Sequence, residues 1–171
     1  GSASFKLENN ITVGALVAVN PVGDATDETG KYFWAAPFEI DGEFGGFDSP
    51  SGGSYAMSFK RPELFPLEDR ANTTIGIIAT DAELTKAQAQ RLATSAHDGI
   101  ARAIVPSHLP FDGDLIFATT TGEVPLRDEV YDFAEICHAA SLCMARAIAR
   151  GVYNAKNLPG DPMPTYKKFN S

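Results

Sequence analysis

The chain has 171 residues, a formal net charge of −8 at pH 7 and a pI near 4.8; 44% of its residues are apolar and 21% charged. These values are ordinary for one soluble globular domain, so we expect residues 1–171 to belong to a single domain. An acidic chain lacks the basic patches that nucleic acids and anionic membranes require, and no apolar run approaches the roughly 20 residues of a membrane span. We therefore expect a cytoplasmic protein with neither of these partners.

The first half of the chain contains one clear strand and a long irregular stretch. The run from Ile11 to Asn20, "ITVGALVAVN", is β-branched and apolar and ends before Pro21, which is typical of a buried strand. No element is predicted before Ile11. Residues 31–69 are aromatic-rich but interrupted by Gly and Pro, which predicts a long loop with short strands at most.

The second half alternates strands and helices. Thr73 to Thr80 reads as a second buried strand, and Thr85 with Gln88 forms a capping box that opens a helix over 84–104, which Pro106 ends. Its predicted apolar face consists of Leu84, Leu92, Ala96, Ile100 and Ile104.

A third strand is predicted over 114–121, followed by a helix over 128–151 with Gly151 as its C-cap. The residues expected to face inward on this helix are Val130, Phe133, Ile136, Cys137, Ala140, Met144, Ala147 and Ile148. Cys137 and Cys143, about 9 Å apart along the helix axis, are too distant for a disulfide and are expected to be reduced core residues. The order of elements predicts an α/β layered fold whose three strands make a thin sheet.

The step from Asn72 to Thr73 is the first feature with possible chemistry. Threonine becomes a useful nucleophile when its own free α-amine serves as the base, and that amine exists only after the preceding peptide bond is cut. The alternative is a plain strand start, because threonine suits a pleated surface.

Two further features could assist such a nucleophile. Asp112 and Asp114, in "FDGDL", are spaced so that both carboxylates can face one site, although Asp and Gly also favour a solvated turn. Asn20, at the end of the first strand, could donate to a developing oxyanion or could simply form an Asn-Pro turn. His97, His108 and His138 come from separate elements without metal-ligand spacing, so we expect no metal and no cofactor.

The run "NTTIGIIATDAELTKAQAQRLATSAHDGIARAIVPSHLPFDGDLIFATTTG", together with "ITVGALVAVNPVG" upstream, resembles the L-aminopeptidase/D-esterase family. That family includes β-peptidyl aminopeptidases and the nylon-oligomer hydrolase. The similarity extends from about Gly1 to Gly151, and the Asp pair is closer to the nylon-oligomer hydrolase branch, since some aminopeptidase members have Ser and Glu at these two positions.

The resemblance implies a self-processing N-terminal-nucleophile hydrolase with an αββα-type layered sandwich. It implies a processing junction at 72/73, Thr73 as nucleophile, Asn20 on the oxyanion side, and Asp112 and Asp114 as the carboxylates that orient and activate the threonine. The implied substrate is a small amide or peptide.

Family chains carry a long region before the first strand, with further strands and an additional Lys or Tyr at the site. We therefore expect this chain to be the C-terminal part of a family chain, to contact the N-terminal fragment, and to assemble as a homo-oligomer of processed heterodimers. Two alternatives remain open at this stage: an acyltransferase that uses the same threonine, and a non-catalytic subunit or interaction domain.

Overall fold

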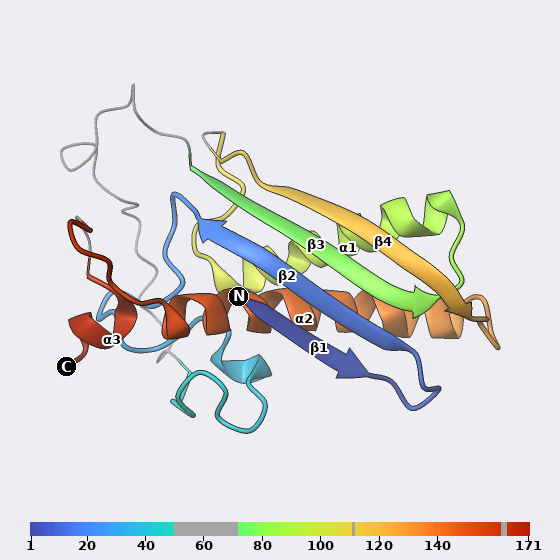
Figure 1. Cartoon of the computed structure of the whole chain (residues 1–171), viewed down its shortest axis with the longest axis horizontal. Coiled ribbons are helices and arrows are strands. Elements are labelled where there is room, and N and C mark those ends of the chain that lie inside the picture. Colours follow the sequence, from blue (N-terminus) through green and yellow to red (C-terminus); the bar gives the residue numbers. More distant parts are fainter. Residues whose placement is uncertain (50–71, 111, 162–163) are drawn as a thin grey trace.

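The computed structural model describes residues 1–49, 72–110, 112–161 and 164–171. Within these residues a four-stranded sheet lies against two long helices, both on the same face of the sheet (Figure 1). The predicted order of strand, helix, strand, helix after residue 72 is confirmed.

The sheet has the order β1-β2-β3-β4, formed by β1 (Ser2–Lys6), β2 (Thr12–Asn20), β3 (Thr73–Ala82) and β4 (Leu115–Val124). Strands β1 and β3 both pair antiparallel with β2, whereas β3 and β4 run parallel. A parallel pair needs a crossover connection, and helix α1 (Lys86–Ala103) supplies it.

Strand β1 was not predicted. In its sequence "SASFK" only Ala3 is buried, and it lies at the edge of the sheet among serines and a lysine. Such a short polar edge strand leaves no periodic apolar signal in the sequence.

Helix α1 begins as predicted. The Thr85 side chain accepts from the Gln88 backbone N–H, and the Gln88 side chain accepts from the Thr85 N–H at 2.8 Å. Leu92, Ala96 and Ile100 are fully buried against the sheet and the second helix, which confirms the predicted apolar face.

Helix α2 (Tyr131–Asn154) differs from the prediction at both ends. Val130 precedes the helix and is 72% exposed, so its predicted inward position is wrong. Gly151 is not a C-cap, because the helix continues for three more residues. A side chain at Gly151 would approach the Gly1 backbone within 2.8 Å, so close packing explains this glycine better than helix termination does.

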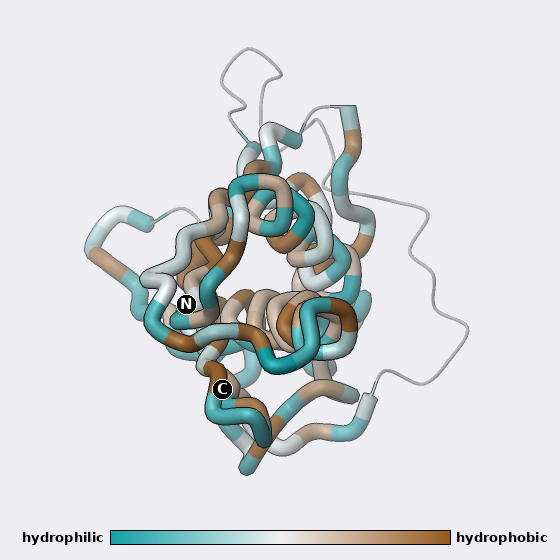
Figure 2. The backbone as a smooth tube through the Cα atoms, turned by 90° about the vertical axis from the view of Figure 1, so that its right-hand side faces the viewer, coloured by the Kyte–Doolittle hydropathy of each residue, from teal (hydrophilic) through white to brown (hydrophobic). Residues whose placement is uncertain are grey.

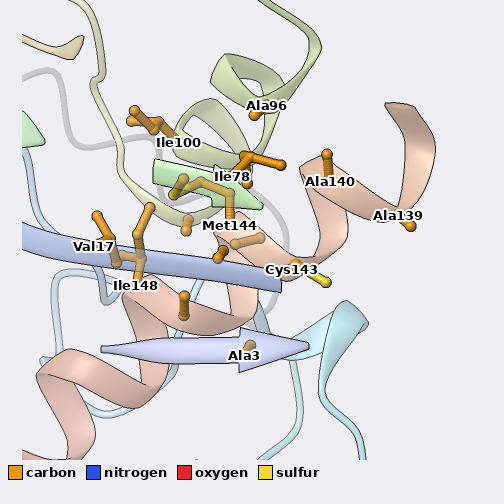
Figure 3. Packing of buried hydrophobic residues seen from close by; sticks show 14 of the residues in the cluster. Ala3, Val17, Ile78, Ala96, Ile100, Ala139, Ala140, Cys143, Met144 and Ile148 are labelled. Carbon is orange, nitrogen blue, oxygen red and sulfur yellow. The ribbon is translucent and has the colours of Figure 1, made fainter. Parts of the chain in front are cut away.

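The centre of α2 forms the core with the sheet. Figure 3 shows Met144 and Ile148 of α2 with Val17 of β2 and Ile78 of β3 in one buried cluster. Cys143 is fully buried, and Cys137 is partly buried; both are free thiols, as predicted.

The described part of the long loop, up to residue 49, packs onto this core. Phe33 and Phe44 are 1% exposed and meet edge to face with ring centroids 5.4 Å apart. The buried Arg146 of α2 donates from Nε and Nη2 to the Glu43 carboxylate, at 2.5 and 3.0 Å. The rest of the predicted loop, residues 50–69, lies outside the described residues.

The sheet face away from the helices is apolar and exposed. Leu16, Ile77 and Phe117 are register partners across β2, β3 and β4, with exposed fractions of 60%, 36% and 57%. Ile75 and Leu115 form a second row beside them. A layered α/β fold normally covers such a face with another layer.

Apolar residues do not collect into a single long segment. Figure 2 shows apolar and polar residues interleaved along the backbone. Among the described residues, no helix has the length and apolar character needed to cross a membrane.

The packing of α1 on α2 at Gly99 gives a stability prediction. A Cβ added at Gly99 of α1 would overlap the Ser141 carbonyl oxygen and lie 2.7 Å from Met144 Cβ, both on α2. We expect Gly99→Ala to lower the free energy of unfolding by about 1–3 kcal/mol, because the helices must move apart. Denaturant unfolding followed by circular dichroism measures this change.

The matched control is Gly14→Ala in β2, where the nearest atoms would lie at 3.8 and 3.9 Å. It should leave stability unchanged or slightly raised, because glycine is unfavourable in a strand. A Gly99→Ala variant as stable as the wild type would contradict the close helix contact.

Candidate active site

The predicted site residues lie at one end of the sheet. Strand β2 ends at Asn20, whose register partner is Thr73 at the start of β3. Because β4 runs parallel to β3, it begins at this same end, and Asp112 forms a bridge with Asn72. Three separate segments of the chain thus bring Asn20, Thr73, Asp112 and Asp114 together.

Thr73 is held against the carbonyl group that precedes it. Its hydroxyl donates to the Asn72 carbonyl oxygen at 2.6 Å, and the Gly113 N–H donates to the same oxygen at 2.9 Å. A Cβ at Gly113 would lie 2.7 Å from Thr73 Oγ1. The absence of a side chain at Gly113 therefore leaves the space that the Thr73 hydroxyl occupies.

The Asp114 carboxylate lies directly behind the start of β3. Oδ1 accepts from the Thr74 N–H at 2.9 Å, across 40 residues of sequence. Oδ2 lies 2.8 Å from His108 Nδ1, and the Asp114 side chain is only 5% exposed. A carboxylate this buried requires hydrogen bonds to both oxygens, and it has them.

The Asp112 carboxylate makes different contacts. Oδ2 accepts from the Leu109 N–H and Oδ1 from the Val22 N–H, each at 3.0 Å. The Asp112 N–H also donates to the Leu109 carbonyl at 2.8 Å, which closes a turn. Asp112 thus has the turn geometry that the sequence offered as one of two alternatives. Its hydrogen bond from Val22 also connects this turn to the segment after β2.

Asn20 lines a pocket of about 640 Å³ beside the end of β2. The pocket lies between the loop that includes Asp24 and Thr26 and the C-terminal residues Tyr166 and Phe169. These last two belong to the short helix α3 (Tyr166–Phe169). Of the four predicted site residues, only Asn20 lines this pocket.

Thr73 and Thr74 occupy opposite faces of β3, as their alternation along a strand requires. Thr74 is fully buried on the helix side, and its hydroxyl has no hydrogen-bond partner among the described residues. Thr73 lies on the other side and is half-buried.

The cysteines are poor candidates for a nucleophile. Burial raises the pKa of the Cys143 thiol to about 11, and its thiol donates to the Val13 carbonyl. Burial also raises the pKa of Cys137. Both thiols therefore stay protonated at neutral pH, and only thiolates are effective nucleophiles.

Two groups at the site were missed by sequence reasoning. His108 was considered only as a metal ligand, and Gly113 only as a spacer between two aspartates. A histidine six residues before Asp114, in "SHLPFDGD", could have drawn attention to a possible carboxylate partner. The Gly113 N–H is a backbone group and leaves no such signal.

Comparison with known proteins gives the family. Residues 1–164 match peptidase family S58, and the chain belongs to this family. A protein of Mycobacterium tuberculosis (strain ATCC 25618 / H37Rv) named as an uncharacterized aminopeptidase is 38% identical over 98% of this chain and 50% of its own length. The 6-aminohexanoate-oligomer endohydrolase of Paenarthrobacter ureafaciens is 30% identical over 72% of this chain and 34% of its own length.

Solved structures show the same fold. The L-aminopeptidase D-Ala-esterase/amidase of Ochrobactrum anthropi, described as a variant of the Ntn-hydrolase fold, matches 95% of this chain and 42% of its own with a TM-score of 0.57 at 20% identity. A Burkholderia β-aminopeptidase matches 89% of this chain and 40% of its own with a TM-score of 0.51 at 22% identity. The fold is thus that of the Ntn-hydrolase-type aminopeptidases, as the sequence resemblance implied.

The chain spans about half the length of the mycobacterial aminopeptidase that it matches.

The Thr74 hydroxyl, for which the described part of the chain offers no hydrogen-bond partner, gives a second stability prediction. A buried hydroxyl without a partner costs about 1–3 kcal/mol, and valine has nearly the same shape. We expect Thr74→Val to raise the free energy of unfolding by about 1 kcal/mol. The midpoint of urea unfolding measures the change.

Thr80 provides the matched comparison, because it is also a buried threonine of β3 but donates to the Thr12 carbonyl at 2.8 Å. Thr80→Val should lower stability by about 1–3 kcal/mol, since the Thr12 carbonyl loses a donor. Equal effects of the two substitutions would show that the Thr74 hydroxyl has a partner after all.

Proposed function

We propose that this chain carries the nucleophile of an amide hydrolase that cuts itself between Asn72 and Thr73. The observation that carries the proposal is the environment of the Asn72 carbonyl, which lies between the Thr73 hydroxyl and the Gly113 N–H. Membership of a peptidase family supports the hydrolase class.

The self-cleavage step uses these two groups. Thr73 Oγ attacks the Asn72 carbonyl carbon, and the negative charge that develops on the carbonyl oxygen is stabilised by the Gly113 N–H. The bond between the Asn72 carbonyl carbon and the Thr73 nitrogen then breaks, and the nitrogen takes up the hydroxyl proton and leaves as the free amine. Water hydrolyses the resulting ester, which frees the Thr73 hydroxyl.

Turnover repeats this chemistry on a substrate amide. The free amine of Thr73 accepts the hydroxyl proton as Oγ attacks the substrate carbonyl, and it then returns the proton to the leaving amine. Asn20, the register partner of Thr73, and backbone N–H groups stabilise the oxyanion. A second water releases the acyl group.

The two carboxylates support the nucleophile in different ways. Asp114 accepts from the N–H of Thr74, the residue next to the nucleophile, and so fixes the start of β3. Asp112 holds the turn that presents the Gly113 N–H, through its bonds to Leu109 and Val22.

The names of two relatives support a proposal for the substrate class. One is named as an uncharacterized aminopeptidase and another as an endohydrolase of 6-aminohexanoate oligomers, and both names denote hydrolysis of amide bonds. We infer that the substrate of this protein is a small peptide or peptide-like amide, which would enter through the pocket beside Asn20.

The whole protein needs a second layer over the apolar sheet face. Leu16, Ile77 and Phe117 would otherwise stay in water, at a cost of about 25 cal/mol for each Å² of apolar surface. We propose that the N-terminal part of the same precursor supplies further strands there. This arrangement is the expected αββα sandwich.

The nucleophile can be tested by intact mass and N-terminal sequencing. The wild type should be cut into residues 1–72 and 73–171, and the second piece should begin Thr73-Thr74-Ile75. Thr73→Ala lacks the hydroxyl and should stay uncut and inactive, whereas Thr73→Ser should retain some processing.

Thr74→Val is the control, because its hydroxyl faces away from the site; it should be processed normally. An uncut wild type that still hydrolyses amides would rule out Thr73 as an N-terminal nucleophile.

Gly113 tests the geometry of self-cleavage. Its φ is not in the left-handed region, so alanine is acceptable to the backbone, but the new Cβ would lie 2.7 Å from Thr73 Oγ1. We expect Gly113→Ala to slow processing by about 10²-fold or more through displacement of the hydroxyl. A time course of cleavage measured by gel electrophoresis gives the rate. Gly14→Ala, at a glycine of β2 where the nearest atoms to the added Cβ would lie at 3.8 and 3.9 Å, is the control for a glycine outside the site, and its processing rate should match the wild type.

A further inference from the structure

His108 contacts the candidate site although no part of the mechanism above uses it. It lies in the loop between α1 and β4, and its Nδ1 is 2.8 Å from Asp114 Oδ2. A carboxylate only accepts hydrogen bonds, so Nδ1 carries the proton in this contact. The ring therefore acts as a donor to the carboxylate behind the nucleophile.

The two oxygens of Asp114 are held by two different segments. One accepts from the Thr74 N–H of β3 and the other from His108. With a single donor the carboxylate could rotate about its side-chain bonds, whereas two donors on opposite oxygens fix its plane. His108 thus completes a connection that runs from the loop through Asp114 to the backbone next to Thr73.

We propose that His108 is a positioning residue, which orients Asp114 so that the Thr74 N–H, and with it the Thr73 nucleophile, is held in place. The inference rests on the function proposed above for Thr73. It adds a residue to that site, and it makes the histidine a part of the reaction's geometry without contact to the substrate.

The other nitrogen of the His108 ring faces helix α1. Its Nε2 lies 3.4 Å from the His97 carbonyl oxygen, and the two imidazole rings are 5.1 Å apart. The pKa of His97 is lowered, first by burial and then by repulsion from His108, so His97 tends to be neutral beside its neighbour. Asp98 on α1 and Asp114 both oppose that lowering.

The backbone at His108 allows an unusually clean set of variants. Its φ is 56°, a left-handed conformation that glycine, asparagine and aspartate tolerate better than other residues. His108→Gly removes the donor without backbone strain. His108→Asn keeps an N–H donor near the position of Nδ1, and His108→Asp has the same shape but can only accept and adds a negative charge.

The three His108 variants should differ in their effect on kcat. We expect His108→Gly to lower kcat for amide hydrolysis by about 10- to 100-fold, the scale expected when a reacting group is slightly misplaced. KM should change by less than about twofold, because His108 does not contact the substrate. His108→Asn should recover much of the loss, and His108→Asp should be the slowest of the three. His138→Asn, at an exposed histidine of α2, is the control and should behave as the wild type.

A measurement without turnover tests the connection itself. In the full chain labelled with ¹⁵N, the Thr74 amide signal should change its chemical shift in His108→Gly, because the Asp114 carboxylate that accepts from this N–H loses its second donor. The signal should stay in place in His138→Asn. An unchanged Thr74 signal in His108→Gly would contradict the proposal, whatever the activity.

A double substitution distinguishes action through Asp114 from an independent effect. If His108 acts through Asp114, adding His108→Gly to Asp114→Asn should cause little further loss of kcat. Full additivity would overturn the inference. A His108→Gly enzyme with wild-type kcat would also overturn it while leaving the proposed function intact, provided that Thr73→Ala is inactive. An active Thr73→Ala enzyme would instead overturn the proposed function.

Discussion

The parallel pairing of β3 with β4 is the constraint on which the candidate site depends. Parallel neighbours begin at the same edge of a sheet, so the residues just before β4 arrive beside the residues just before β3. The Gly113 N–H thereby reaches the Asn72 carbonyl, and Asp114 reaches the Thr74 N–H. Helix α1 makes this pairing possible, because a parallel connection must cross over the sheet. The packing of α1 on α2 at Gly99 therefore contributes indirectly to the position of Thr73.

The two aspartates show that chemically identical side chains can have different hydrogen-bond partners because of their positions. They are two residues apart, and the sequence suggested one shared site for both. The structure gives each its own set of donors: backbone N–H groups for Asp112, and one backbone N–H with an imidazole for Asp114. Asp112 closes a turn, so its contacts resemble those of many structural aspartates. Each carboxylate also has one partner distant in sequence, Val22 for Asp112 and Thr74 for Asp114, and only the partner of Asp114 is next to the proposed nucleophile.

Much of the fold could be predicted because its elements carry strong periodic signals. Strands β2, β3 and β4 and helix α1 were found from apolar patterns and from the capping box at Thr85. Strand β1 was missed because an edge strand with one buried residue has no pattern. The extent of α2 was misjudged because Gly151 was taken as a helix terminator, whereas the structure shows a position without space for a side chain.

The site was predictable only in part, for a related reason. Side chains such as Thr73 and Asp114 can be recognised in a sequence, but backbone donors and local conformations cannot. The Gly113 N–H and the left-handed backbone at His108 follow from how the loop before β4 folds against β3. The roles of Thr73, Asn20, Asp112 and Asp114 as catalytic groups remain proposals, whereas their proximity is a feature of the structure.

The antiparallel pairing of β2 with β3 has a consequence for the processed protein. The ladder runs from Val13 opposite Thr80 to Asn20 opposite Thr73, so a cut at 72/73 would divide two strands that remain side by side. The two pieces would then be held by noncovalent contacts alone. Unfolding would release them from each other, and refolding would require them to meet in solution, at a rate that depends on protein concentration. A protein matured in this way would owe its persistence to slow unfolding rather than to a reversible equilibrium, because the uncut precursor from which it folded no longer exists.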